Sequence, residues 1–166
     1  EAKRRNVQSY AKFLGWGQGS DGHNVAISHP EGRGLKGAMA NALRDAKLNS
    51  SDIDYVNAHA PSTSIGDASE MKALKATFPL PHEVLVSSTK PLTGHGLSLS
   101  SIMEAAFCCI ALKDQFLPGS AHVTTPDPEL GHLKLLRKSQ DHPVKRIMSN
   151  SSGFGGANVS VIFEKA

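Results

Sequence analysis

Apolar and polar residues follow helical spacing in three stretches of the chain. Between residues 34 and 47, apolar side chains recur at steps of three and four positions and charged residues lie off that stripe, which predicts an amphipathic helix. Residues 67–77 favour a second helix by their composition. Residues 97–113 are apolar almost all round the helical pattern, so we expect this third helix to be sandwiched between layers of the fold.

Short runs of β-branched and aromatic residues predict the strands. These runs cover residues 7–16, 53–57, 84–88, 146–150 and 159–163. Strands that alternate with helices indicate an α/β domain with a largely parallel or mixed sheet and helices on both faces. Because the chemistry of such sheets lies beyond the carboxyl ends of the strands, we expect the site in the loops after residues 57, 88 and 150.

A glycine-rich stretch, GQGSDG at residues 17–22, matches the dinucleotide-binding pattern G-x-G-x-x-G. That pattern holds a pyrophosphate only where a helix N-terminus follows at once, and no helical period begins here before Gly34. We therefore interpret residues 17–22 as a turn, and we expect no cofactor.

Composition narrows the class of protein. With 166 residues, 39% of them hydrophobic and 20% charged, the chain is typical of one soluble globular domain over residues 1–166. A formal net charge of +3 is too small to predict nucleic-acid binding, and no apolar run approaches the ~20 residues of a membrane-spanning helix. Because the first residue is Glu1 rather than methionine, and no signal peptide follows it, we expect a piece of a longer protein.

Cysteine usage favours a reducing compartment. The two cysteines, Cys108 and Cys109, are adjacent and cannot join distant parts of the fold through a disulfide. We therefore expect a cytoplasmic protein, or a plastid or mitochondrial one in a eukaryote. Both lie in the middle of the third predicted helix, far from any feature that would favour a thiolate, and we interpret them as core residues. No carboxylate or cysteine ligands stand at metal spacing beside the histidines, so we expect no metal site.

The three loops after the central strands contain the candidate chemistry. His59 follows a buried strand and is suited to donate a hydrogen bond to a developing oxyanion, although a lone histidine at such a place is more often structural. The second loop places Lys90 and His95 at the entrance of the apolar helix. A cation in a dry interior needs a carboxylate partner, and we expect Glu70 in that role. The third loop contains Gly-Phe-Gly-Gly at residues 153–156, which is a common turn but also lets backbone N–H groups approach a ligand.

Taken in order, these loops resemble the motifs of one enzyme family. They read NAHAPSTSIGDASE, SSTKPLTGH and NSSGFGGAN, where the family has roughly N-x-H-G-T-S-T-x-x-G-D-x-x-E, S-x-K-x-x-x-G-H and N-S-F-G-F-G-G-x-N. Over nearly its whole length the chain is similar to the C-terminal half of a β-ketoacyl-[acyl-carrier-protein] synthase of the type I/II condensing enzymes. The resemblance implies the C-terminal half of a thiolase-like fold, which is one α/β layer pair of a five-layer α-β-α-β-α architecture.

The resemblance also implies a reaction, decarboxylative Claisen condensation in fatty acid or polyketide-like biosynthesis. In this family a cysteine thiolate takes an acyl chain from a carrier protein, malonyl-carrier protein loses CO2, and the resulting carbanion attacks the acyl thioester. By motif position, His59 and His95 donate N–H bonds to the enolate-like oxygen. Lys90, paired with Glu70, orders the site electrostatically.

Two further roles are implied by the same motifs. Phe154, with Gly155 beside it, matches a gating aromatic whose backbone N–H helps to form the acyl oxyanion hole. Thr63 matches a threonine that contacts the pantetheine arm of the carrier protein. The nucleophilic cysteine of the family lies in an N-terminal half that is absent here, so we expect this chain alone to be inactive and to expose an apolar helix face that promotes self-association. The implied partners are acyl-carrier protein, the N-terminal half and, for the full-length enzyme, a second copy in a homodimer.

The chain departs from the family motifs in three places. Ala60-Pro61 replaces Gly-Thr, which removes one hydroxyl and one backbone N–H, and Ser152 replaces a phenylalanine. Residues 98–101, SLSS, replace the small stretch Gly-Ala-Ala-Gly. Two alternatives stay open: a non-condensing subunit similar to a chain-length factor, and a thiolase-type coenzyme A enzyme. The loop motifs disfavour the thiolase. A thiolase also has a second catalytic cysteine near its C-terminus, and no cysteine follows Cys109 in this sequence.

Overall fold

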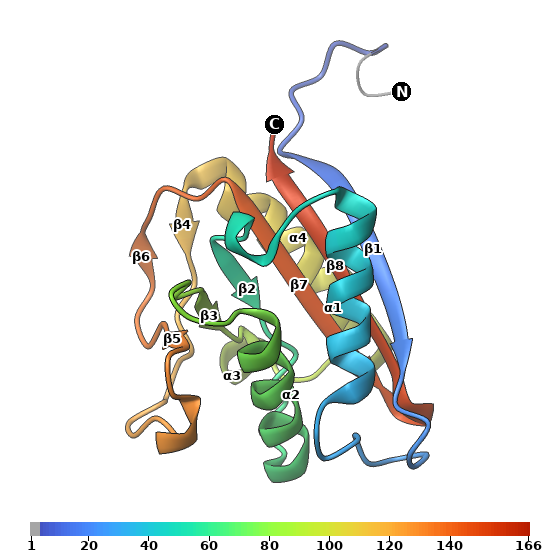
Figure 1. Cartoon of the computed structure of the whole chain (residues 1–166). Helices are drawn as coiled ribbons and strands as arrows, with labels where there is room; N and C mark the ends of the chain where they lie inside the picture. Colours follow the sequence, from blue (N-terminus) through green and yellow to red (C-terminus); the bar gives the residue numbers. More distant parts are fainter. Residues whose placement is uncertain (1–3) are drawn as a thin grey trace.

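The computed structural model describes residues 4–166 and consists of a mixed six-stranded sheet with helices on both faces (Figure 1). The helices are α1 (Arg33–Ala46), α2 (Ser64–Thr77), α3 (Lys90–Thr93) and α4 (Ser100–Asp114). The strands are β1 (Ala11–Ser20), β2 (Tyr55–Asn57), β3 (Leu85–Ser87), β4 (Phe116–Leu117), β5 (Lys134–Leu135), β6 (Gln140–Asp141), β7 (Arg146–Gly153) and β8 (Ala157–Lys165). The α/β class and the mixed sheet predicted from the sequence are confirmed.

The order of the strands explains how the loops come together. The sheet runs β1-β8-β7-β2-β3-β5, and a separate pair is formed by β4 and β6. At the centre, β2 pairs in parallel with both β3 and β7, so that Asn57 lies opposite Ser87 on one side and Ser149 on the other. The carboxyl ends of three strands therefore meet at one edge of the sheet, as the sequence predicts.

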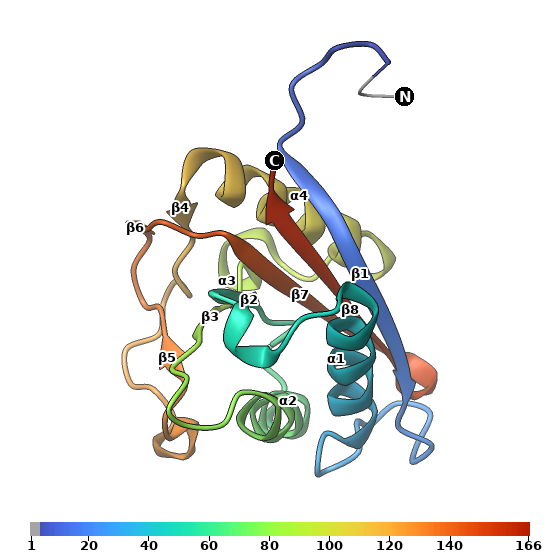
Figure 2. The ribbon, with the colours of Figure 1, turned by 45° about the horizontal axis from the view of Figure 1, so that its top comes forward.

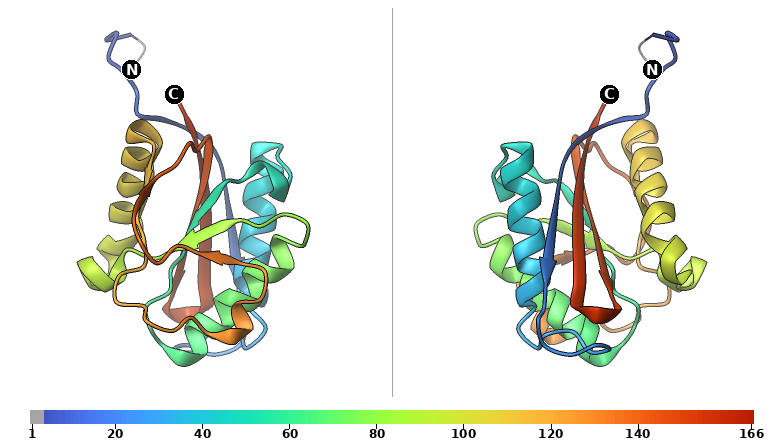
Figure 3. Two further views of the ribbon diagram at one scale, coloured as in Figure 1. Left: turned by 90° about the vertical axis from the view of Figure 1, so that its left-hand side faces the viewer. Right: turned by 90° about the vertical axis from the view of Figure 1, so that its right-hand side faces the viewer.

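Two helix layers enclose the sheet. α1 and α2 lie side by side on one face, and α4 lies on the other, as Figures 2 and 3 show. α1 closes its face because its apolar stripe, Leu35, Ala38, Met39 and Ala42, is buried against the sheet. Among residues 4–166, no helix has both the length and the apolar character needed to cross a membrane.

The glycine-rich stretch after the first predicted strand is not a turn. β1 continues through Gly17 and Gly19 to Ser20 in antiparallel pairing with β8. A Cβ atom on Gly17 would lie 2.2 Å from the carbonyl oxygen of Ala38, and one on Gly19 would lie 2.1 Å from that of Gly34. The absence of a side chain at these glycines lets the backbone of α1 approach the strand. The glycines therefore serve close packing of the helix on the sheet and not a reversal of the chain.

α4 has only one covered side in this chain. Cys108, Ala111 and Leu112 are buried against the sheet, whereas Ile102 is 65% exposed and Ile110 is 46% exposed. The expectation of a helix sandwiched between layers is therefore met on one side only within residues 4–166. A helix that is apolar on both sides needs a second layer to cover it.

Candidate active site

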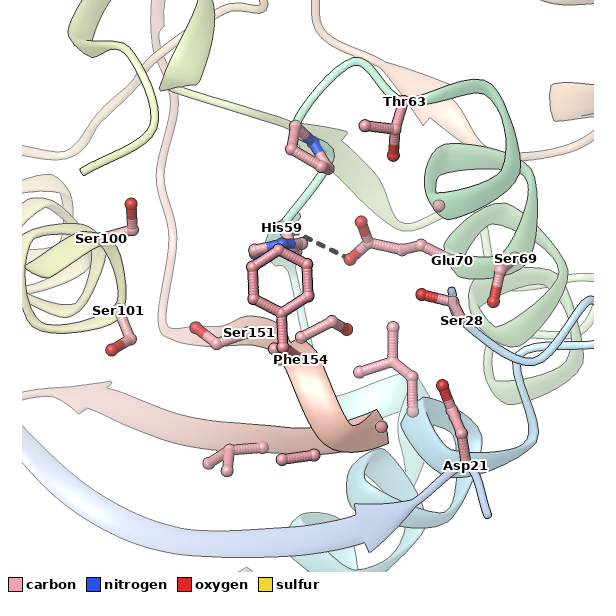
Figure 4. A pocket seen from close by; sticks show the side chains of 18 of the residues that line it. Asp21, Ser28, His59, Thr63, Ser69, Glu70, Ser100, Ser101, Ser151 and Phe154 are labelled. Atoms are coloured by element: carbon pink, nitrogen blue, oxygen red, sulfur yellow. Dashed lines mark hydrogen bonds between the residues drawn. The ribbon is translucent and has the colours of Figure 1, made fainter. Parts of the chain in front are cut away.

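A pocket of about 570 Å³ lies at the edge of the sheet where the three loops meet. The pocket is lined by His59, Thr63, His95 and Phe154, together with Glu70 and a group of serines. Figure 4 shows that α4 and α2 approach the pocket from opposite sides, with Ser100 and Ser101 on the first helix and Ser69 and Glu70 on the second. Five of the seven residues predicted for the site thus line one pocket, and Lys90 and Gly155 lie outside its lining.

The two histidines face each other. The ring centroids of His59 and His95 are 5.3 Å apart, and the ring planes are nearly perpendicular, at 83°. Burial lowers the pKa of His59 to about 3, and the positive charges of Lys90 and of a protonated His95 act in the same direction. The His59 imidazole is therefore neutral at physiological pH and keeps one N–H to donate. Its Nδ1 atom is buried and has no hydrogen-bond partner among residues 4–166.

The tautomer of His95 follows from its neighbours. The backbone N–H of Leu97 donates to His95 Nδ1 at 3.2 Å, and the hydroxyl of Ser100 lies 2.9 Å from the same atom. A backbone N–H can only donate, so Nδ1 accepts and the proton of the neutral ring is on Nε2. The ring thus has an N–H on the side away from these contacts.

Lys90 pairs with Glu104 and not with Glu70. The Lys90 Nζ atom lies 2.5 Å from Glu104 Oε1, and both side chains are buried. The prediction of Glu70 as the partner is wrong because Lys90 reaches a carboxylate on α4, which lies on the opposite face of the sheet from α2 (Figure 3), whereas the Glu70 oxygens accept backbone N–H groups of the first loop. Burial raises the pKa of Glu104, and the hydrogen bond from Lys90 opposes that shift. The sequence did carry a signal, since Glu104 is the only charged residue between Lys90 and Lys113.

Glu70 instead holds the backbone of the first loop. Its two carboxylate oxygens accept hydrogen bonds from the N–H groups of His59, at 3.0 Å, and Ala60, at 2.7 Å. The side-chain amide of Asn150 approaches Glu70 at 3.4 Å from β7. Burial raises the pKa of the Glu70 carboxyl group, and these N–H donors partly offset the shift. Glu70 therefore fixes the backbone position from which the His59 side chain extends.

Thr63 sits where the first loop turns into α2. Its backbone carbonyl accepts the N–H of Asp67 at 2.8 Å, and its own N–H donates to the Asp67 carboxylate at 3.3 Å. This pairing fixes the first turn of α2. The Thr63 side chain stays on the pocket lining, on the α2 side of Figure 4.

The Phe154 loop connects β7 to β8 and forms the rim of the pocket. The Phe154 side chain is 80% exposed, and the N–H of Gly155, at a φ of 77°, donates to the carbonyl of Val25 at 2.7 Å. That N–H is already engaged and is not available to a ligand. The loop is thus tied to the segment between β1 and α1.

A buried carboxylate that the sequence did not predict supports this rim. Asp21 accepts hydrogen bonds from the N–H groups of His29 and Gly34 and from the amide of Asn158, and its own N–H donates to the carbonyl of Gly156. Asp21 therefore joins the end of β1, the start of α1 and the rim loop through its carboxylate and its backbone N–H. Its signal in the sequence was hidden in the stretch interpreted as a turn.

Neither cysteine belongs to the pocket. Cys108 is buried on the sheet side of α4, and burial raises the pKa of its thiol. Burial also raises the pKa of the half-buried Cys109 thiol. The interpretation as a core residue is confirmed for Cys108, whereas Cys109 is only half-buried among residues 4–166.

Comparisons with known proteins agree with the fold and the loops. The family model for the β-ketoacyl synthase C-terminal domain matches residues 10–124. A 3-oxoacyl-[acyl-carrier-protein] synthase 2 from Staphylococcus aureus strain COL is 39% identical over 165 residues, which are 99% of this chain and 40% of that protein. The mitochondrial 3-oxoacyl-[acyl-carrier-protein] synthase of Arabidopsis thaliana is 40% identical over 98% of this chain and 36% of its own length.

Solved structures give the same result. A β-ketoacyl synthase from Burkholderia phymatum has a TM-score of 0.92 and 34% identity over 99% of this chain and 40% of its own. A ketosynthase in complex with its chain length factor from Xenorhabdus doucetiae has a TM-score of 0.88 and 35% identity over 96% of this chain and 40% of its own. A type II polyketide ketosynthase in complex with its acyl-carrier protein, bound to the hexaketide, has a TM-score of 0.94 and 25% identity over 99% of this chain and 41% of its own. The chain spans about 40% of the length of these relatives, and it belongs to the family of β-ketoacyl synthase C-terminal domains.

Proposed function

We propose that this chain is the C-terminal half of a β-ketoacyl-[acyl-carrier-protein] synthase, which joins an acyl thioester to malonyl-carrier protein by decarboxylative Claisen condensation. The observation that carries the proposal is the pair of imidazoles, His59 and His95, whose ring centroids lie 5.3 Å apart in the pocket. The family membership and the named activities of its relatives support the same reaction.

The difficult step is the loss of CO2. As the bond between the malonyl α-carbon and its carboxylate breaks, the electron pair moves into the thioester and a negative charge develops on the thioester oxygen. The N–H groups of two imidazoles that already line the pocket stabilise this oxygen without a large reorganisation of the site. The enolate carbon then attacks the acyl thioester, the new carbon–carbon bond forms and the cysteine thiolate of the N-terminal half leaves.

Neutral histidines suit this step better than protonated ones. A neutral imidazole donates a hydrogen bond but does not readily give up its proton, so the enolate is stabilised and is not quenched. The low pKa of His59, about 3, supports this role. In the proposal, Lys90 contributes by keeping a positive charge near His59, while Glu104 compensates that charge in the dry interior.

The remaining site residues have proposed roles at the pocket entrance. Thr63 lies on the pocket lining, which supports a contact between its side chain and the pantetheine arm. The exposed Phe154 side chain stands at the rim, where a gating role fits its position, with Gly155 anchoring the loop to Val25. These roles are implied by the family motifs, and they are supported by the positions of Thr63 and Phe154 on the pocket lining.

The proposed partners are acyl-carrier protein, the N-terminal half and a second full-length copy. One relative is a ketosynthase in complex with its acyl-carrier protein, which supports the first partner. The exposed apolar side of α4, with Ile102 and Ile110, supports the second, since an N-terminal layer would cover it. The homodimer and the compartment stay predictions.

A second function is supported by a specific relative, the ketosynthase bound to its chain length factor. A non-condensing subunit of that kind would keep this half and lack the nucleophile. The gene upstream of the codon for Glu1 separates the two functions. We expect it to encode a half with a cysteine at a strand-to-helix turn, and the purified full-length protein to form a 3-ketoacyl product from acyl- and malonyl-carrier protein. A glutamine or serine at that turn, with no product, would favour the non-condensing subunit.

A further inference from the structure

Ser100 occupies an unusual place for a serine. It is the first residue of α4, it is 3% exposed, and its hydroxyl lies 2.9 Å from Nδ1 of His95. Ser100 belongs to the SLSS sequence at residues 98–101, which stands where the family motif has Gly-Ala-Ala-Gly. The hydroxyl is therefore directed at a site residue from within the protein interior.

The direction of this hydrogen bond is fixed by a second contact. The N–H of Leu97 donates to the same Nδ1 atom, so Nδ1 is an acceptor and carries no proton. The Ser100 hydroxyl must then be the donor. Two donors converge on one ring nitrogen, and both disfavour the tautomer that carries its proton on Nδ1.

The Ser100 hydroxyl does not cap the helix. α4 begins after Leu99 without a side-chain cap hydrogen bond, and the serine hydroxyl is directed to the imidazole instead. Ser100 and Glu104 are four residues apart and therefore share one face of α4. On that face, the first residue holds His95 and the second holds Lys90. α4 thus positions two of the site residues from one buried stripe.

We propose that Ser100 is a positioning residue that holds His95 in the Nε2–H tautomer and fixes its ring against His59. The catalytic consequence rests on the proposed function, because there the Nε2–H group stabilises the enolate oxygen. The tautomer itself does not rest on it, so the two are tested separately. The charged and titratable groups near His95 are His59, Lys90 and Glu104, and none of them contacts its Nδ1 atom.

The first test is imidazole ¹⁵N NMR on the chain at about pH 8, above the ordinary range of histidine protonation. We expect His95 Nδ1 to give the signal of an unprotonated nitrogen, and Ser100→Ala to raise the ratio of the Nδ1–H to the Nε2–H tautomer about threefold to tenfold, as expected for one lost hydrogen bond. Ser101→Ala, the same change one residue further along, leaves the ratio unchanged. Alanine favours helices, so Ser100→Ala keeps α4, which circular dichroism verifies.

The second test uses the full-length protein and measures CO2 release from malonyl-carrier protein. Ser100→Ala lowers kcat about threefold to tenfold, leaves KM within about twofold, and Ser100→Thr restores kcat because it returns the hydroxyl. A wild-type His95 that is protonated on Nδ1, or a folded Ser100→Ala variant with an unchanged tautomer ratio, overturns the proposal. A wild-type protein that releases no CO2 refutes the proposed function instead, and the NMR result still decides the role of Ser100.

Discussion

The two faces of the sheet differ in how completely this chain covers them. On one face, α1 buries an apolar stripe that includes Leu35 and Met39, each no more than 2% exposed, and turns its polar side outward. On the other face, α4 buries Cys108 and Leu112 but leaves Ile102 65% exposed. The α1 face is complete, whereas the α4 face is apolar on both sides of its helix.

Each face also contributes one buried glutamate to the same pocket edge. Glu70, from the α1 and α2 face, accepts backbone N–H groups and fixes the His59 loop. Glu104, from the α4 face, balances the charge of Lys90. The α1 and α2 face therefore fixes the loop that contains His59, whereas the α4 face contributes the buried Lys90–Glu104 pair and the hydroxyl that contacts His95. The site thus lies between the face that α1 and α2 cover and the face on which α4 leaves apolar side chains exposed.

The largest expected effect comes from breaking the buried ion pair on the open face. Lys90→Met leaves the Glu104 carboxylate buried without compensation and lowers the free energy of unfolding by about 3–5 kcal/mol. The double variant with Glu104→Leu recovers most of that loss, because no charge remains. Urea unfolding followed by circular dichroism measures both, with Lys36→Met, at an exposed position of α1, as the control. A loss below about 1 kcal/mol in the single variant would show that the pair is solvated.

The next effect compares the two helices directly. Leu35→Ala on the closed face removes a buried side chain and costs about 2–5 kcal/mol of unfolding free energy. Ile102→Ala on the outer side of α4 changes it by no more than about 0.5 kcal/mol, because the side chain is largely exposed. Equal losses in the two variants would mean that α4 is covered in the isolated chain, and the contrast between the faces would be lost.

The pH dependence of stability sharpens the role of His59. Its pKa is lowered to about 3 in the folded state, so the unfolded state binds a proton first as the pH falls below the ordinary histidine range. The chain therefore loses stability on acidification, about 1–2 kcal/mol between about pH 7 and about pH 5 from this group. Glu70 and Glu104 act oppositely, because burial raises their pKa values and the folded state then takes up protons first.

Comparison with His59→Asn isolates the histidine, because the carboxylates are common to both proteins. We expect the wild type to lose about 1–2 kcal/mol more than the variant over that pH range. Parallel stability curves for the two proteins would indicate that His59 titrates normally and is not held neutral by its surroundings.

Changes on the outer side of α4 have the smallest expected effect on the free energy of unfolding and a large expected effect on self-association. We expect the isolated chain to bind 1-anilinonaphthalene-8-sulfonate and to self-associate through the outer side of α4. Replacing Ile102 and Ile110 by lysine reduces both, while the free energy of unfolding changes by no more than about 0.5 kcal/mol. Sedimentation and dye fluorescence measure the outcome. A wild-type chain that is a monodisperse monomer without dye binding would contradict the open-face account.

The sequence predicted the architecture wherever side-chain periodicity determines the element. The stripe that begins at Leu35 identified α1, and the apolar runs located β2 and β3 within about two residues. The two-residue strands β4, β5 and β6 have no period and could not be recognised. Gly17 and Gly19 suggested a turn, because local composition does not reveal that a helix backbone will pack against a strand.

The candidate site was predictable as a set of loops but not as a set of contacts. Parallel pairing of β2 with β3 and β7 brings His59 and His95 into one pocket, as the positions of the loops indicate. Glu70 was the wrong partner for Lys90 because the face on which a helix lies is a tertiary property. Ser100 carries no sequence signal of its role, since its hydroxyl is meaningful only beside the His95 ring.

The most direct measurement is the rate of CO2 release from malonyl-carrier protein by the full-length protein with His59→Ala or His95→Ala. We expect each variant to lose about 100-fold to 1,000-fold in kcat, as for removal of one oxyanion donor. Cys109→Ala, on α4 and outside the pocket, keeps the wild-type rate. Folded His59→Ala and His95→Ala variants that both stay within about threefold of wild type would contradict the claim that the two imidazoles stabilise the enolate.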